Sequence, residues 1–132
     1  MAAKKAGNLP AIYLYEEYYM VLLSLSDEET GKLIKAMILY RQGKEPDLKS
    51  ERLQGMFDIF KARLDAAEKS YQLKSIRKAY SASQRGKEKA EQESIGEWFS
   101  EQKRFRREIY NIPAAEDYYQ NFSVSEIEDY RE

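Results

Sequence analysis

The spacing of apolar side chains near the N-terminus predicts an amphipathic helix. Apolar residues recur there at intervals of three and four, and they are Tyr15, Tyr18, Tyr19, Leu22 and Leu23. Tyrosines at this spacing are typical of a core or an interface, and the alternative is a platform on which nucleic-acid bases stack. The short apolar run at 11–14 follows Pro10, so we expect a short extended segment before the helix.

A second helix is indicated by a capping pattern and a matching stop signal. Ser26 and Glu29 have the spacing of a capping box, in which each side chain accepts a hydrogen bond from the other residue's backbone N–H. A wide apolar face follows between residues 33 and 40. Gly43 fits the position just after a helix end, and Pro46 cannot continue the helix.

The third predicted helix is long and changes its apolar face. Asp47 or Ser50 can cap its start, and a regular stripe runs from Leu53 to Tyr71. Beyond Tyr71 the apolar residues Leu73, Ile76 and Tyr80 share a face that is rotated by about half a turn. Either the helix breaks near Tyr71, or one continuous helix uses two faces. In the second case the later face is a self-association seam or a dock for the C-terminal part.

The C-terminal part is also predicted to be helical. A helix is expected from about Ile95 to Tyr110, anchored by Trp98, Phe99 and Ile109, before Pro113 interrupts it. One or two short helices follow, and a second capping-box pattern begins at residue 123.

These elements predict an all-α protein, a small helical bundle with a long third helix and a helical C-terminal extension. The expected organisation is a helical domain over 1–80, a linker or frayed helix over 81–94, and a helical, acidic region over 95–132. Charged residues make up 34% of the chain, which contains only 6 glycines and 3 prolines, and this composition favours helices over sheets.

The chain contains no histidine and no cysteine. The usual general base, the usual nucleophile and the usual transition-metal ligands are therefore missing, so we expect a protein that is not an enzyme and needs no metal or cofactor. Catalysis by carboxylates and Mg²⁺ is the weaker alternative. Without cysteine there is no disulfide framework, and no apolar run is long enough to cross a membrane. The expected location is the cytoplasm of a bacterial cell.

Basic residues gather in two stretches that could follow a phosphate backbone. The candidate nucleic-acid contacts are Lys74, Arg77, Lys78, Arg85, Lys87, Lys89, Lys103, Arg104, Arg106 and Arg107. The alternative is a solvated helix surface crossed by weak ion pairs between neighbouring turns.

The C-terminal region combines acidic and aromatic side chains. Its candidate partner-binding residues are Glu116, Asp117, Tyr118, Tyr119, Glu126, Glu128, Asp129 and Tyr130. Carboxylates spread over a folded surface can imitate nucleic-acid phosphates, and tyrosines among them supply rigid contact area. This combination suits a protein that occupies the nucleic-acid groove of another protein, and the alternative is a solvated acidic tail.

Part of the chain resembles an uncharacterised phage and prophage family. The resemblance lies in an aromatic first helix and in Leu25–Tyr40, Gly43–Leu48 and Met56–Asp65, and it covers residues 13 to about 67. It implies a small helical module of mobile-element origin, and some relatives resemble phage replication proteins. Family members tend to continue into a basic tail, which is thinned here to the sequence at 82–87. The family implies no catalytic residues.

Two functions are therefore predicted. The first is a non-catalytic phage or mobile-element protein that binds a host protein or nucleoprotein and blocks it, as anti-CRISPR and other anti-defence proteins do. The second is a nucleic-acid-binding accessory module of phage replication, which would contact DNA or RNA. Both include a homodimer formed through Leu73, Ile76 and Tyr80, unless Trp98 and Phe99 fold back onto those residues.

Overall fold

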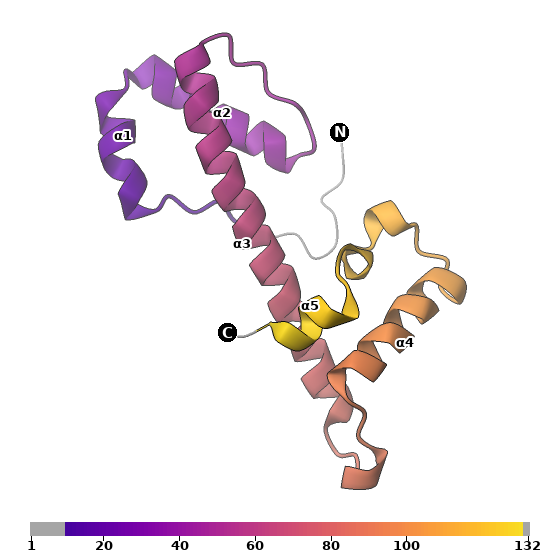
Figure 1. Ribbon diagram of the computed structural model, residues 1–132. Coiled ribbons are helices and arrows are strands. Elements are labelled where there is room, and N and C mark those ends of the chain that lie inside the picture. Colours follow the sequence, from indigo (N-terminus) through magenta and orange to yellow (C-terminus); the bar gives the residue numbers. More distant parts are fainter. Residues whose placement is uncertain (1–9, 131–132) are drawn as a thin grey trace. The chain divides into compact units, whose positions relative to one another are not determined.

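The computed structural model describes residues 10–130, and all its regular elements are helices (Figure 1). The α-helices are α1 (Tyr19–Ser24), α2 (Asp27–Arg41), α3 (Glu51–Gln84), α4 (Ile95–Glu108) and α5 (Val124–Asp129). Short 3-10 helices are η1 (Glu16–Tyr18), η2 (Lys89–Glu91), η3 (Ala114–Glu116) and η4 (Tyr118–Asn121). The predicted all-α class is confirmed, because no strand occurs over residues 10–130. These residues divide into an N-terminal unit, 10–68, and a C-terminal unit, 69–130.

In the N-terminal unit, α1 and α2 lie against the first half of α3 (Figure 1). The Tyr18 ring packs on the Phe60 ring, with 4.2 Å between the centroids. The buried residues of this core are Tyr18, Leu25, Leu33, Ala36, Met37, Leu53, Phe57, Phe60 and Leu64. They come from η1, α2, α3 and the residue that follows α1, while Leu22 of α1 is half-buried against them. The core thus joins the elements of the unit.

The first helix is shorter than its apolar stripe predicts. Residues 11–15 form neither helix nor strand, and the Tyr15 backbone is extended, as expected for the segment before the helix. Tyr18 is buried, whereas the side chains of Tyr19 and Leu23 are 49% and 81% exposed. Successive residues of a helix are rotated by about 100° around its axis. Tyr19 and Leu23 therefore lie outside the side of the helix that packs against α3.

Both ends of α2 follow the predicted local chemistry. Ser26 Oγ accepts a hydrogen bond from the Glu29 N–H at 3.1 Å, and Glu29 Oε1 accepts one from the Ser26 N–H at 3.0 Å. At the other end Gly43 has a φ of 81°. Its N–H donates to the Tyr40 carbonyl, and the Lys44 N–H donates to the Leu39 carbonyl. This pair of bonds is a Schellman motif, which needs a residue that tolerates positive φ.

Helix α3 begins after Ser50, whose Oγ accepts a hydrogen bond from the Leu53 N–H at 3.3 Å, and it is continuous through Tyr71. Of the two alternatives at Tyr71, the continuous helix with two apolar faces is the one observed. The first face, which includes Phe57, belongs to the N-terminal unit, and the second, which includes Ile76, belongs to the C-terminal unit.

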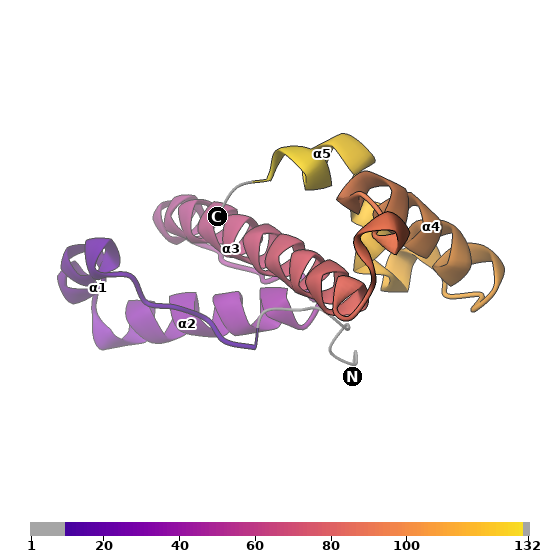
Figure 2. The same ribbon diagram turned by 90° about the horizontal axis from the view of Figure 1, so that it is seen from below.

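In the C-terminal unit, α4 and α5 pack with the second half of α3 (Figure 2). Its buried core consists of Leu73, Ile76, Trp98, Phe99, Tyr119, Phe122 and Ile127. The helix α4 starts with the Ser94 hydroxyl accepting from the Glu97 N–H, and it ends at Glu108. Ile109, which the sequence suggests as an anchor, lies after this end and is 60% exposed.

The predicted self-association seam on α3 is covered within the chain itself. Leu73 and Ile76 are buried by the C-terminal segment, and Tyr80 is half-buried with its ring 5.6 Å from that of Trp98. The fold-back of Trp98 and Phe99 is thus the alternative that the structure adopts. The reason for expecting a dimer through these residues is removed, and a homodimer stays a prediction without that support.

The segment 81–94, expected to be a linker or a frayed helix, is helical at its start and a loop after that. Its first residues continue α3, and the loop that follows is tied back to the end of that helix. The Gln84 side-chain oxygen accepts from the Glu93 N–H at 2.9 Å, and the Tyr80 hydroxyl donates to the Glu93 carbonyl at 2.6 Å. The two units meet inside α3, between Glu68 and Lys69. They meet there because the C-terminal segment uses the second face of α3 as part of its own core.

Candidate binding surfaces

Asp117, a predicted partner-binding residue, is a buried structural anchor. Its side chain is 1% exposed. Asp117 Oδ1 accepts from Arg106 Nε at 2.7 Å and from the Tyr119 N–H at 3.2 Å, and Oδ2 accepts from the Gln120 amide at 3.1 Å. A carboxylate with three donors inside the fold cannot contact a partner, so the prediction for Asp117 is wrong.

The predicted aromatic contacts are also turned inward. Tyr119 is buried, stacks on Phe99 with 5.8 Å between the centroids, and carries the Arg106 guanidinium 4.1 Å from its own ring centre. Burial raises the pKa of Tyr119 to about 12. Tyr118 and Tyr130 are half-buried against the same core. The aromatic half of the predicted partner surface therefore builds the C-terminal core, where only Tyr118 and Tyr130 keep some exposure.

The remaining carboxylates of that group differ in their roles. Glu126 closes the predicted capping box with Ser123, as expected, and pairs with Lys69 at 3.3 Å. The Ser123 N–H lowers the pKa of Glu126 by stabilising its charged form. Glu116 and Asp129 are exposed. Glu128 is exposed as well.

Glu128 lines a hollow in the C-terminal unit that is predominantly acidic. The hollow has a volume of about 550 Å³, and its lining residues are Ser94, Gly96, Glu97, Ser100, Glu101, Arg104, Val124 and Glu128. Gly96 allows the close approach of α5, because a Cβ at this position would lie 3.1 Å from the Glu128 carboxylate. A hydrogen bond with Glu93 raises the pKa of Glu101. Glu97 and Glu101, which lie one helical turn apart on α4, are not among the site residues predicted from the sequence.

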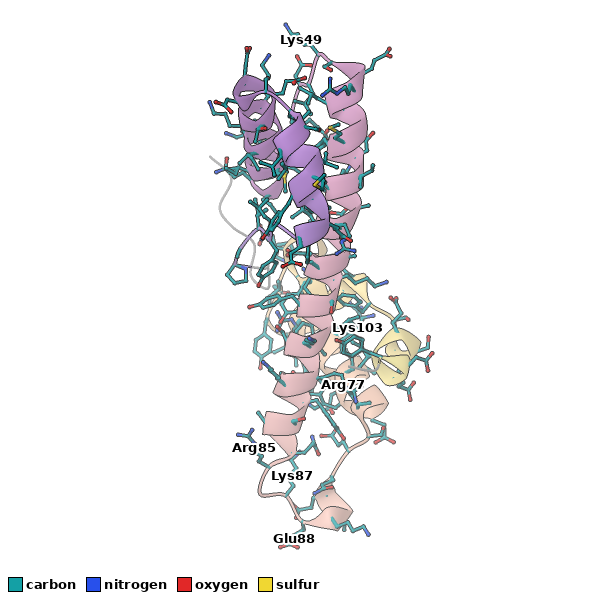
Figure 3. The ribbon with its side chains drawn as sticks, turned by 90° about the vertical axis from the view of Figure 1, so that its left-hand side faces the viewer. Lys49, Arg77, Arg85, Lys87, Glu88 and Lys103 are labelled. Carbon is teal, nitrogen blue, oxygen red and sulfur yellow. The ribbon has the colours of Figure 1, made fainter. Side chains whose placement is uncertain are left out.

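Several of the predicted nucleic-acid contacts instead fasten the C-terminal segment (Figure 3). Arg77 donates to the Ile127 carbonyl at 2.9 Å, and Lys103 donates to the Phe122 carbonyl at 2.7 Å. Arg106 holds Asp117, and Lys87 pairs with Glu93 at 3.4 Å. These bonds hold the cationic groups within the fold. A long cationic side chain can reach a backbone carbonyl that is distant in the sequence, and the sequence alone does not reveal that contact.

The other predicted cations remain at the surface, and three of them lie on or just after the second half of α3. Lys74 and Lys78 are exposed and lie four residues apart on one side of this helix, and the exposed Arg85 lies in the turn that follows the helix end at Gln84. They form no ion pair within residues 10–130. No acidic residue occurs between Lys69 and Lys87 in the sequence. We call Lys74, Lys78 and Arg85 the basic face.

The rest of the exposed cations are more scattered. Lys89 lies in η2, Arg104 lies 5.1 Å from the Phe105 ring, and Arg107 pairs with Glu108 at 3.6 Å. The sequence predicted one group that contains both these residues and the basic face, because charge and order along the chain do not show which side chains share a surface.

Helix α1 carries exposed apolar side chains. Met20 and Leu23 are 80% and 81% exposed, and Tyr19 is 49% exposed. Exposed apolar side chains that lie close together are typical of protein interfaces. If the protein self-associates, α1 offers more uncovered apolar surface than the predicted seam on α3.

Residues 10–130 contain no group of three or more acidic, histidine or cysteine side chains placed to hold a metal ion. No helix among these residues is both long and apolar enough to cross a membrane.

The protein is helical, and the basic face, the acidic hollow and the exposed side chains of α1 are surface features of its described residues. Residues 11–92 match DUF6291, a family of unknown function, and the chain belongs to that family. No curated protein and no solved structure matches the chain. The resemblance to an uncharacterised family is confirmed at that level, and phage origin stays a prediction. The matched segment contains the basic face, and it ends before α4, which supplies much of the acidic hollow.

Proposed function

We propose that the protein is a non-catalytic, nucleic-acid-binding accessory module of a phage or other mobile element, and that it binds through the basic face. The main support is that Lys74, Lys78 and Arg85 lie on the end of α3 or just after it, are exposed and form no ion pairs within residues 10–130. A cation that has no partner within the protein can replace a counterion at a phosphate, and the released counterion drives binding. The basic face also lies inside the segment that matches the family.

The spacing of these residues suits a backbone more than a base. Lys74 and Lys78 lie about 6 Å apart along the helix axis, and Arg85 follows in the turn after α3. The residues between them on the same side of α3 are small, since Ser81 lies there and no aromatic side chain interrupts the row. Binding is thus expected to depend strongly on salt and weakly on base sequence.

The test is a salt titration with labelled duplex DNA, single-stranded DNA and RNA, followed by fluorescence anisotropy. Three phosphate contacts on duplex DNA predict a slope of about −2.7 for log K against log salt. The variant K74Q/K78Q/R85Q should lose most of the affinity and most of the slope. Absence of binding at low salt, or affinity that does not depend on salt, would contradict the proposal.

A matched control removes the same charge from the N-terminal unit. The variant K32Q/K35Q/K49Q changes three exposed or partly exposed lysines on α2 and just before α3, and it should bind nucleic acid as the unchanged protein does. Equal losses in both variants would mean that only net charge matters, and that the basic face is not the site.

A second candidate function is the blocking of a host protein or nucleoprotein, and the acidic hollow is the observation that favours it. Glu97, Glu101 and Glu128 line the hollow with Arg104 as its only cation. A basic nucleic-acid-binding surface would be complementary to it, and such complementarity speeds association and selects partners. Asp117 and Tyr119 take no part, since both are buried.

An arginine-rich peptide tests this second function by anisotropy. The variant E97Q/E128Q should weaken binding about tenfold, because it removes two carboxylates that face one hollow. The control E88Q/E91Q removes two exposed carboxylates from the segment around η2 and should have little effect. Equal affinity of E97Q/E128Q and the unchanged protein would exclude the hollow as a partner site.

A further inference from the structure

The N-terminal unit contains an apolar groove with a basic rim. It lies along α2, the turn that follows α2 and the start of α3, and it has a volume of about 610 Å³. Its lining residues are Lys32, Lys35, Ala36, Leu39, Pro46, Asp47, Leu48, Lys49, Ser50 and Leu53. All of them belong to one compact unit, so the groove is a feature of that unit alone.

The floor of the groove is aliphatic. Ala36 and Leu53 are buried parts of the core, whereas Leu39, Pro46 and Leu48 are half-exposed along its length. No aromatic residue lines the groove, so it offers no surface on which a base could stack. An aliphatic side chain of a partner would gain most there, because it would cover apolar surface that now faces water.

The rim is positively charged. Lys35 and Lys49 are exposed and form no ion pair over residues 10–130, while Lys32 has one exposed pair with Glu28 at 3.2 Å. Asp47 is the only acidic residue among those that line the groove. Figure 3 labels Lys49 beside the first turn of α3, where the positive end of the helix dipole adds to the local charge.

We infer that this groove binds an acidic peptide segment of a partner protein, with aliphatic side chains on the floor and carboxylates at Lys32, Lys35 and Lys49. A nucleic-acid strand would satisfy the lysines but leave the aliphatic floor uncovered. A neutral apolar peptide would cover the floor but leave the charges unused. Only a chain that alternates acidic and aliphatic side chains matches both properties.

The local structure favours a groove that is already formed in the absence of a partner. The Schellman motif at Gly43 fixes the end of α2, and the Ser50 hydroxyl fixes the start of α3. The turn between them holds Leu48 against the core of the unit. A preformed groove lowers the ordering cost of binding.

The experiment uses the full chain as bait for a displayed library of short random peptides, with each enriched peptide then measured by fluorescence anisotropy. We expect enriched peptides to combine Asp or Glu with Leu, Ile or Val, and K35E/K49E to weaken their binding at least tenfold. The charge-matched control K89E/R107E changes two exposed cations of the C-terminal unit and should bind them as the unchanged protein does.

Two further variants separate charge from apolar contact. Leu39→Gln should weaken the same peptides while circular dichroism shows an unchanged melting temperature, because Leu39 lines the groove but is not part of the buried core. Enrichment of basic or neutral peptides, no enrichment at all, or equal losses in K35E/K49E and K89E/R107E would overturn the inference. Binding of nucleic acid that K35E/K49E abolishes would assign the rim to phosphates instead. A negative result in these peptide experiments would not contradict nucleic-acid binding by the basic face, because that binding is tested with different residues and a different ligand.

Discussion

Replacing Ile76 with alanine should lower the free energy of unfolding of the C-terminal unit by about 2–5 kcal/mol. Ile76 is fully buried where the second face of α3 meets the C-terminal core. Truncation removes apolar contact area and leaves a cavity that the surrounding rings cannot fully fill. Trp98 is the only tryptophan of the chain and lies in the same core, so its fluorescence in a denaturant titration follows this unit.

Another isoleucine on the same helix supplies the control. Ile59 is 62% exposed, so Ile59→Ala should change the free energy of unfolding by no more than about 0.5 kcal/mol, measured by circular dichroism. The two variants also distinguish the fold-back from a dimer seam. If Ile76→Ala converted a dimer to a monomer in light scattering without lowering the Trp98 midpoint, packing within one chain would be contradicted.

Replacing Asp117 with alanine is expected to cost about 3 kcal/mol. The substitution leaves Arg106, whose side chain is only 25% exposed, without its carboxylate partner. It also removes the acceptor for the Tyr119 N–H and for the Gln120 amide. Breaking a buried ion pair from one side is expensive because the remaining charge loses its partner and does not regain full hydration.

The neighbouring residue Glu116 is the matched control. Its side chain is exposed, so Glu116→Ala should alter the free energy of unfolding by less than about 0.5 kcal/mol. Asp117→Asn should give an intermediate loss, since the amide keeps one acceptor but not the charge. Equal stabilities of the two alanine variants would show that Asp117 does not anchor the C-terminal segment. Charge reversal at Asp117 is therefore unsuited to testing partner binding.

The local signals in the sequence were read correctly. The capping boxes at Ser26 and Ser123 and the turn at Gly43 all form as their patterns predict. Each depends on atoms within a few residues along the chain, so its energy hardly changes with the rest of the fold. The all-α class follows for the same reason, because helical spacing is a local property.

The candidate surfaces were predicted less well. Charge along the chain grouped Arg77 and Lys103 with Lys74 and Lys78, although the first two bind backbone carbonyls inside the C-terminal unit. Composition also treated Asp117 and Glu116 as equivalent. Exposure separates such neighbours, and exposure depends on which distant segment covers each side chain.

The sequence by itself determined the helices, their caps, the change of apolar face on α3 and the absence of histidine and cysteine chemistry. The tertiary structure alone decided that the second face of α3 is covered by its own C-terminal segment, and which charges remain at the surface. It also decided that Lys32, Lys35 and Lys49 gather around one aliphatic groove. The physical reason is range: caps and periodicity act within a few residues, whereas burial and surface charge depend on segments brought together from far along the chain.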